Sequence, residues 1–495
     1  MQIISCFSGA VCKNTMKGTI RNILIFTGIA VVAWLGIHHV QEFRFYNLEC
    51  SDLFLYDWAD IAGRLKQAGG LALVASSFLT QFMGIPYVGA AIATLIYMLS
   101  AWILCRILGK SGASEALAGF SFLPSAFLFL CLENEYYLFN GHVAFLLVLA
   151  ALWGYVSLPR QRWGLRLVAG VAALPLLYHA VGSAAVVFAV SAFVVEISSL
   201  RIRGLWAAAY LALMVIAAFA YVRTGLADSW DAALTPYMYY NYPSTYFFPL
   251  YAWAVVPLLV MAAGLLPDFS RKPKAAVAVS AVGLVFSFIL AGNFYTQVHS
   301  RSTYRLIQEQ HWAYKGDWDS IIETADRRQP TYLVSYLNLA LAQKNQLLEN
   351  FRYYNPQQIG SVMLPVPNIK LGMSLQSCVY LSWGYVSAAR QSAFDANMVT
   401  SGMRNPLQLK VLVQTNMAAG DHEVAQKYRN ILSRTLFYRE WAENVPELDV
   451  KLPSEDEYVR HDGMIGDMED ILAANPSNRI MSQFYELYKI LEVKE

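Results

Sequence analysis

The feature that most constrains this chain is a series of apolar segments that occupies its first 293 residues. Hydrophobic residues make up 56% of the 495 residues and charged residues only 15%, a balance typical of membrane proteins. Nine runs approach the length that crosses a bilayer: 23–40, 87–108, 117–132, 141–158, 165–178, 183–197, 204–222, 250–266 and 275–293. Because lipid-embedded backbone must satisfy its own hydrogen bonds, the sequence predicts an all-α fold that begins with a polytopic transmembrane helical bundle of about nine spans.

Lys and Arg residues between these runs predict the orientation of the chain. With a cytoplasmic N-terminus, thirteen cations fall in cytoplasmic segments and four in the outside loops before residue 294. The cytoplasmic set is Lys13, Lys17, Arg21, Arg106, Lys110, Arg160, Arg162, Arg166, Arg201, Arg203, Arg271, Lys272 and Lys274; the outside set is Arg44, Arg64, Lys66 and Arg223. The odd number of spans then places the C-terminal region outside the cytoplasm.

Composition also excludes several classes of protein. The net charge of +2 without a clustered basic face gives no reason to propose a nucleic-acid partner. The six cysteines show no metal-ligand spacing, so neither a metal site nor a disulfide framework is predicted, and no cofactor is expected. The first apolar run is too long for a cleaved signal sequence and lacks a small-residue cleavage site, which indicates a retained anchor.

The first outside loop, residues 41–86, is rich in acidic residues. Residues 52–65 have apolar side chains at helical spacing, with Asp57, Asp60 and Arg64 on a common stripe, which predicts an amphipathic helix on the membrane surface. The apolar run at 71–85 is short and ends at Pro86, so we interpret it as a re-entrant or interfacial helix.

The residues from about 294 to 495 form a second predicted domain, after a membrane domain at 1–293. Helical patterns recur there in pairs that turn at Gly316, Asn345, Gly384 and Gly420. The stretch around Trp312, with its Gly turn, a later Ala325 and Pro330, resembles a tetratricopeptide (TPR) hairpin. The alternative to a TPR-like domain is an ordinary helical bundle.

Four carboxylates are candidates for catalysis: Asp57 and Asp60 in the first outside loop, and Glu133 and Glu135 in the second. A carboxylate at the membrane surface is suited to deprotonate an incoming hydroxyl group, and acidic residues at a membrane boundary are costly unless they are solvated or paired. The alternatives are the polar face of an interfacial helix and a hydrated loop end. Asp52 belongs to the same first-loop set.

Candidate binding residues are cationic or aromatic. The cations that could hold a phosphate are Arg44, Arg64, Lys66, Arg223, His299, Arg301 and Arg305, with Arg64 the first choice because it lies one turn from Asp60. In the aromatic loop near residue 240, Tyr239, Tyr240 and Tyr242 could contact an acceptor, since aromatic rings stack on sugar faces. Snorkelling cations and an interfacial aromatic belt are the alternatives.

This architecture resembles the C-type glycosyltransferases (GT-C), which use polyprenyl-phosphate sugars. The resemblance rests on a single N-terminal span, a long acidic first outside loop, a short acidic second loop and an extracytoplasmic C-terminal domain. It implies a catalytic Asp57 or Asp60, assisted by Glu133 or Glu135. The chain is also similar, through Tyr56-Asp57-Trp58, Gly69-Gly70 and residues 78–82, to an uncharacterised family of multi-span proteins from the inner membrane of Bacteroidota-type bacteria.

The resulting hypothesis is an inner-membrane glycosyltransferase that moves a sugar from a polyprenyl-phosphate carrier to a periplasmic protein or glycan, with the helical repeats recruiting that acceptor. The alternative is a non-catalytic membrane-anchored scaffold, because helical repeats bind partners through concave surfaces. A transporter is disfavoured, since no predicted span has an ionisable residue at its centre.

Overall fold

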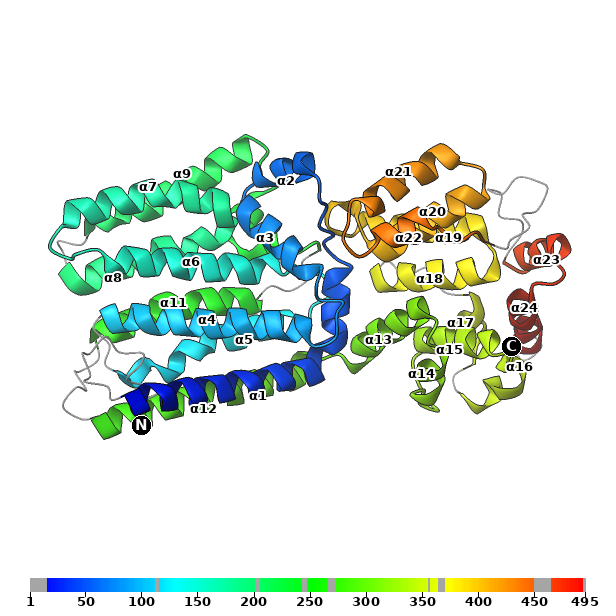
Figure 1. Ribbon diagram of the computed structural model, residues 1–495, viewed down its shortest axis with the longest axis horizontal. Coiled ribbons are helices and arrows are strands. Elements are labelled where there is room, and N and C mark those ends of the chain that lie inside the picture. The colour runs from blue at the N-terminus through cyan, green and yellow to red at the C-terminus, as the bar shows by residue number, and fades with distance from the viewer. Residues whose placement is uncertain are drawn as a thin grey trace. The chain divides into compact units, whose positions relative to one another are not determined.

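A computed structural model describes residues 16–111, 115–200, 205–242, 247–265, 273–354, 357–363, 370–448 and 464–492 (Figure 1). These residues are helical and form no β-strand, and one isolated bridge joins Tyr137 to Tyr240. The chain divides into two compact units: unit 1 comprises Met1–Leu48 and Asp57–His299, and unit 2 comprises Glu49–Tyr56 and Ser300–Glu495. Of the cations used to predict orientation, Lys13, Arg201, Arg203, Arg271 and Lys272 lie outside the described residues.

Unit 1 contains the apolar helices. They are α1 (Met16–Glu49, whose last residue belongs to unit 2), α2 (Trp58–Leu65), α3 (Gly70–Thr80), α4 (Val88–Ser111), η1 (Glu115–Leu117), η2 (Gly119–Phe122), α5 (Leu123–Cys131), α6 (Asn140–Ser157), α7 (Trp163–Val181), η3 (Gly182–Ala184), α8 (Ala185–Leu200), α9 (Ala208–Arg223), α10 (Trp230–Leu234), η5 (Pro236–Tyr239), α11 (Phe247–Leu265) and α12 (Pro273–Val298).

Six segments of the described residues are long and apolar enough to cross a membrane, which makes this a membrane-associated protein. One of them, Trp163–Ser198, covers both α7 and α8, which are separated at Gly182, where φ is +73° and an L side chain would be strained. The helices α3 and α5 are shorter. The predicted number of nine spans therefore stays a prediction.

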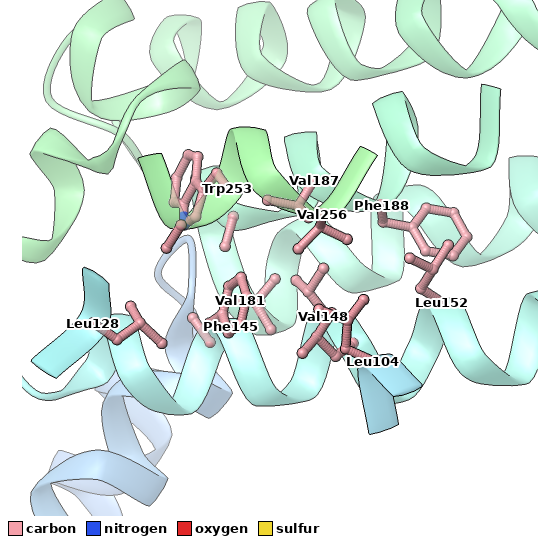
Figure 2. Packing of buried hydrophobic residues seen from close by; sticks show 14 of the residues in the cluster. Leu104, Leu128, Phe145, Val148, Leu152, Val181, Val187, Phe188, Trp253 and Val256 are labelled. Atoms are coloured by element: carbon pink, nitrogen blue, oxygen red, sulfur yellow. The ribbon is translucent and has the colours of Figure 1, made fainter. Parts of the chain in front are cut away.

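The core of unit 1 is a continuous apolar cluster around α6. Phe145, Val148 and Leu152 on α6 pack between residues of α4, α5, α8 and α11, as Figure 2 shows. Lipid tails are as apolar as these side chains, so association of such helices depends on close packing and on buried polar contacts. Among the glycines of the described residues, the tightest position is Gly119, where an added Cβ would lie 1.7 Å from the carbonyl oxygen of Ser280 on α12.

A buried polar node ties four helices of unit 1 together. Arg166 Nη2 on α7 lies 3.0 Å from Glu196 Oε1 on α8, and each side chain is 1% exposed. Tyr155 on α6 donates to the same carboxylate oxygen at 2.9 Å, and its ring centroid lies 4.8 Å from the guanidinium carbon. Tyr210 on α9 donates to the Arg166 carbonyl at 2.9 Å. Because every member contacts another helix, the node fixes how these helices pack.

Unit 2 is a series of helical pairs. Its helices are α13 (Arg301–Lys315), α14 (Trp318–Glu323), α15 (Thr331–Gln343), α16 (Leu347–Asn350), η6 (Phe351–Tyr353), α17 (Ile359–Met363), α18 (Lys370–Trp383), α19 (Val386–Met398), η7 (Ser401–Met403), α20 (Pro406–Ala418), α21 (His422–Ser433), α22 (Arg439–Glu443), α23 (Met464–Ala474) and α24 (Arg479–Glu492).

The turns of these pairs fall at the residues that the sequence indicates. Gly316, Gly384 and Gly420 have φ values of 71°, 75° and 82°, and Asn345 has φ 60°. This left-handed conformation ends a helix and satisfies its last carbonyls, and glycine and asparagine adopt it at the least cost. The four predicted hairpins are thus present as helical pairs, while their assignment as TPR repeats stays a prediction.

Residues 49–56 separate from the rest of the first outside loop and belong to unit 2. The amide of Tyr56 donates to the Arg434 carbonyl at 2.7 Å, and the Tyr438 hydroxyl donates to Glu49 Oε1 at 2.5 Å. The predicted amphipathic helix at 52–65 is therefore too long. The helix α2 begins only at Trp58, because Asp57 adopts an extended conformation and caps it, accepting a hydrogen bond from the Ala59 amide at 3.0 Å.

A buried carboxyl group in α13 makes the stability of the chain depend on pH. Burial raises the pKa of Glu309 from 4.5 to about 7, and the hydrogen bond from Arg305 Nε, at 2.9 Å, offsets only part of this. The folded protein thus holds the proton more tightly than the unfolded chain does. The protonated Glu309 side chain contributes fully to the free energy of unfolding below pH 4.5, the pKa of this group in the unfolded chain. The contribution is lost as the pH rises through 7, and its maximum is on the order of 3 kcal/mol.

We expect Glu309→Gln to remove this pH dependence. Burial also lowers the pKa of His311 to about 4, which acts in the opposite direction, because stability is then lost as the pH falls below its ordinary value of 6.5. The informative quantity is therefore the difference in melting temperature between Glu309→Gln and wild type. The melting temperature of Glu309→Gln relative to that of wild type should be higher at about pH 8 than at about pH 5. The same difference at both pH values would contradict the raised pKa of Glu309.

Candidate functional site

The site begins with a bend in α1. Gln41 has φ −128° and ψ 17°, so the helical backbone is interrupted there and the end of α1 turns away from its axis (Figure 1). The turned segment packs closely on α4, where a Cβ added to Gly89 would lie 2.6 Å from Phe45 Cγ. The bend brings Gln41 and Arg44 to the turn that follows α5.

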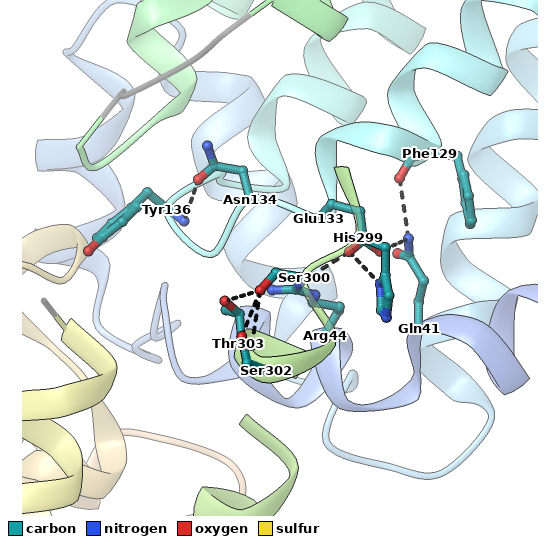
Figure 3. Close-up of polar contacts among 10 residues, drawn as sticks. All are labelled: Gln41, Arg44, Phe129, Glu133, Asn134, Tyr136, His299, Ser300, Ser302 and Thr303. Carbon is teal, nitrogen blue, oxygen red and sulfur yellow. Dashed lines mark hydrogen bonds and ion pairs between the residues drawn. The ribbon is translucent and has the colours of Figure 1, made fainter. Parts of the chain in front are cut away.

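Glu133, in that turn, is the centre of a buried polar cluster (Figure 3). Gln41 Nε2 donates to Glu133 Oε1 at 3.0 Å, and Arg44 Nη2 donates to Oε2 at 3.1 Å. The third contact comes from the end of α12, where His299 Nδ1 lies 3.0 Å from the same Oε2. Gln41 also donates to the Phe129 carbonyl at 3.5 Å. Two residues of α1 and the residue after α12 thus meet on one carboxylate in the turn after α5.

The cluster is enclosed on one side and accessible on the other. The side chains of Arg44 and Glu133 are 1% and 3% exposed, whereas that of His299 is 22% exposed. Within the described part of the chain, Arg44 Nε and Nη1 and Gln41 Oε1 find no hydrogen-bond partner. Buried polar atoms are usually paired, and protein atoms do not use the hydrogen-bonding capacity of these three. The cluster can therefore bind an anion or another polar group.

An apolar groove of about 830 Å³ lies between α1, α4, α5 and α12. Its walls are almost entirely hydrocarbon and aromatic, with Gly36 on α1 and Gly292 on α12 among the lining residues. Two lining residues also contact the cluster: Phe129 through its carbonyl, and Tyr295 through its ring, which stacks on His299 with centroids 4.8 Å apart. Phe129 and Tyr295 therefore connect the groove to the cluster, although the cluster residues themselves are not among those that line it.

The structure brings together some of the predicted site residues and leaves others elsewhere. Arg44 and Glu133 form one ion pair. Asp57 caps α2, and Asp60 accepts from Arg64 Nε at 3.0 Å within the same helix. In Figure 1, α2 lies away from α5 and from the end of α12. Three predicted residues remain: Glu135 is partly exposed and its carbonyl accepts from Asn47 at 3.3 Å, while Lys66 and Arg223 are exposed.

The three predicted acceptor tyrosines have different surroundings. Tyr239 is buried, donating to the Val181 carbonyl at 2.5 Å and accepting from the Ala184 amide at 3.0 Å. Tyr240 is buried in the bridge to the Glu133 loop. Only Tyr242 is well exposed, at 66%. A ligand could therefore reach Tyr242, whereas the other two hold the loop in place.

Gln41 is the member of the cluster that sequence reasoning missed, although a polar residue directly after the first apolar run was an available signal. The sequence indicates His299 only as one of several cations that could hold a phosphate. Across the described ranges, no group of three or more His, Cys, Asp or Glu side chains is arranged to hold a metal ion.

The fold and the site define a class: a helical membrane protein in which an apolar groove adjoins, through Phe129 and Tyr295, a cluster that contains a buried carboxylate, an arginine and a histidine. The chain belongs to the DUF6057 family, a family of unknown function, whose family model matches residues 16–492. That match includes helices of both units. No curated protein and no solved structure matches the chain.

Proposed function

We propose that this protein is an inner-membrane glycosyltransferase that moves a sugar from a polyprenyl-phosphate carrier to a periplasmic protein or glycan. The observation that carries the proposal is an apolar groove two of whose lining residues, Phe129 and Tyr295, contact the cluster that holds the Arg44–Glu133 ion pair. A polyprenyl chain needs an apolar groove that opens among membrane helices, and its phosphate needs a cation with hydrogen-bond donors to spare. Arg44 has two such donors.

In this proposal the groove holds the lipid chain and Arg44 binds the phosphate. Positive charge in a site of low dielectric stabilises the phosphate as it leaves the sugar, and such stabilisation is usually the largest single contribution to the rate of an enzyme. Glu133 holds Arg44 in place. Asp57 and Asp60, the carboxylates of the first outside loop, remain candidates for catalysis. Unchanged sugar transfer by Asp57→Asn and Asp60→Asn variants would exclude them from that role.

Filling the groove is expected to reduce lipid binding. Gly36 and Gly292 line the groove, and a Cβ added at either position meets no atom within 4 Å, so Gly36→Leu and Gly292→Leu place a side chain in the groove without a backbone clash. We expect each to lower crosslinking to a photoactivatable polyprenyl phosphate by about tenfold or more, equivalent to ~1.4 kcal/mol or more of lost affinity.

The matched control is Gly154→Leu. Gly154 on α6 also has open space around its Cβ position but does not line the groove. Labelling of purified protein in nanodiscs should be unchanged in this variant. If all three variants were labelled as strongly as wild type, the groove would not be the lipid site.

The helical pairs of unit 2 favour a second candidate function, a membrane-anchored scaffold. In a glycosyltransferase these pairs would recruit the acceptor, whereas in a scaffold their binding of a partner would be the whole function. Release of polyprenyl phosphate from a panel of polyprenyl-phosphate sugars, measured with cell-envelope acceptors, separates the two. A scaffold would release none and would keep its partner when the Glu133 cluster is altered.

A further inference from the structure

We infer that His299 is the general base that deprotonates the acceptor hydroxyl in the proposed transfer, and that Glu133 is its positioning residue. The inference rests on the proposed function and deepens it. In this inference the group that receives the proton is an imidazole held by a carboxylate, and not a carboxylate alone.

The contacts of Glu133 select which nitrogen carries the proton when the His299 ring is neutral. Both carboxylate oxygens are engaged, Oε1 by Gln41 at 3.0 Å and Oε2 by Arg44 at 3.1 Å and by His299 Nδ1 at 3.0 Å. A carboxylate paired with Arg44 accepts hydrogen bonds, so Nδ1 carries a proton, and in the neutral ring it is then Nε2 that has the lone pair a base needs. A carboxylate that orients an imidazole in this way is a recurrent means of preparing a base.

The position of the ring suits this role better than the position of Glu133 does. His299 follows the last residue of α12 and stacks on Tyr295, which lines the groove, with 4.8 Å between ring centroids and 27° between ring planes. Its side chain is 22% exposed, against 3% for Glu133. A polar acceptor can thus approach the imidazole while Glu133 stays enclosed behind it.

The step that follows is balanced without any further reactant. The acceptor oxygen forms a bond to the anomeric carbon of the sugar while its proton moves to His299 Nε2. The bond between that carbon and the lipid-phosphate oxygen breaks, and the phosphate keeps the electron pair, opposite Arg44. The imidazolium ion that forms is stabilised by Glu133 and later passes its proton to water.

Chemical rescue distinguishes a base from a structural contact. We expect His299→Ala to lower the release of polyprenyl phosphate by a factor of about 10² to 10⁴, the usual contribution of general base catalysis, and added imidazole to restore part of the rate. Glu133→Gln should also lower the rate but should not respond to imidazole, because its own imidazole is still present. His179→Ala is the matched control, since His179 Nδ1 pairs with the Tyr221 hydroxyl at 2.7 Å and lies outside the cluster.

His299→Gln guards against loss of the fold, since its amide can still donate to Glu133. Thermal unfolding like that of wild type, combined with the same loss of rate, would support the base. A rate within a few-fold of wild type in His299→Ala, or a loss that imidazole leaves unchanged, would overturn the role of His299 alone. Absence of donor turnover in the wild-type protein would instead overturn the proposed function, and this inference with it.

Discussion

Glu196→Ala is expected to lower the free energy of unfolding by about 3–5 kcal/mol, the cost of leaving one partner of a buried ion pair without the other. Arg166 would keep its charge at 1% exposure, with the Tyr155 ring centroid 4.8 Å from its guanidinium carbon. The measurement is unfolding of the purified full-length protein in mixed detergent micelles, followed by tryptophan fluorescence.

The double variant Arg166→Met and Glu196→Leu is the control for this prediction. Replacing both charges by apolar side chains of similar size is often neutral or stabilising, so most of the lost stability should return. A double variant as unstable as Glu196→Ala would show that the loss of stability comes from altered side-chain packing and not from the unpaired charge of Arg166. Donor turnover should survive in the double variant, because none of the node residues belongs to the Glu133 cluster.

Arg44→Met is expected to lower the release of polyprenyl phosphate by a factor of about 10² to 10³, as removal of a preorganised electrostatic contact to a developing anion does elsewhere. The variant keeps the volume and the apolar stem of Arg44 and removes the guanidinium group. The measurement is the initial rate of polyprenyl-phosphate release from the lipid-linked sugar in nanodiscs.

Loss of Arg44 also leaves Glu133 buried without its cation, so the stability of Arg44→Met is expected to fall as well. Adding Glu133→Gln removes the second charge and should recover stability without recovering the rate. Recovery of both together would mean that the pair serves only the fold. Arg44→Lys, which keeps the charge as a point cation, should fall between wild type and Arg44→Met.

Local features of this fold were predictable. The apolar runs predict helices because lipid leaves the backbone no other partners, and α4, α6, α11 and α12 occupy runs that the sequence marks. In unit 2 the turns at Gly316, Gly384 and Gly420 were predictable because a left-handed residue ends a helix whatever surrounds it. The prediction of a helix over 52–65 places the start of α2 too early. The spacing of Asp57 in the sequence is the same whether this residue lies inside the helix or caps it.

Long-range contacts were not predictable in the same way. Glu133 was identified as a candidate, but its partners lie 92 residues before it at Gln41 and 166 residues after it at His299. The bend of α1 and the end of α12 decide those distances, and neither has a local pattern. Arg166 was assigned to a cytoplasmic loop as one cation among many, and its pairing with Glu196 depends on how α7 and α8 pack.

The sequence by itself determined that this is a helical membrane protein with paired helices in its C-terminal part, because hydrophobic length and turn residues act over a few neighbouring positions. Only the tertiary structure decided that Arg44, Glu133 and His299 meet in one cluster that contacts the lining of an apolar groove, and that residues 49–56 leave the first outside loop to join the second unit. These are contacts between distant segments, and their free energy depends on side chains that only the packed helices bring together.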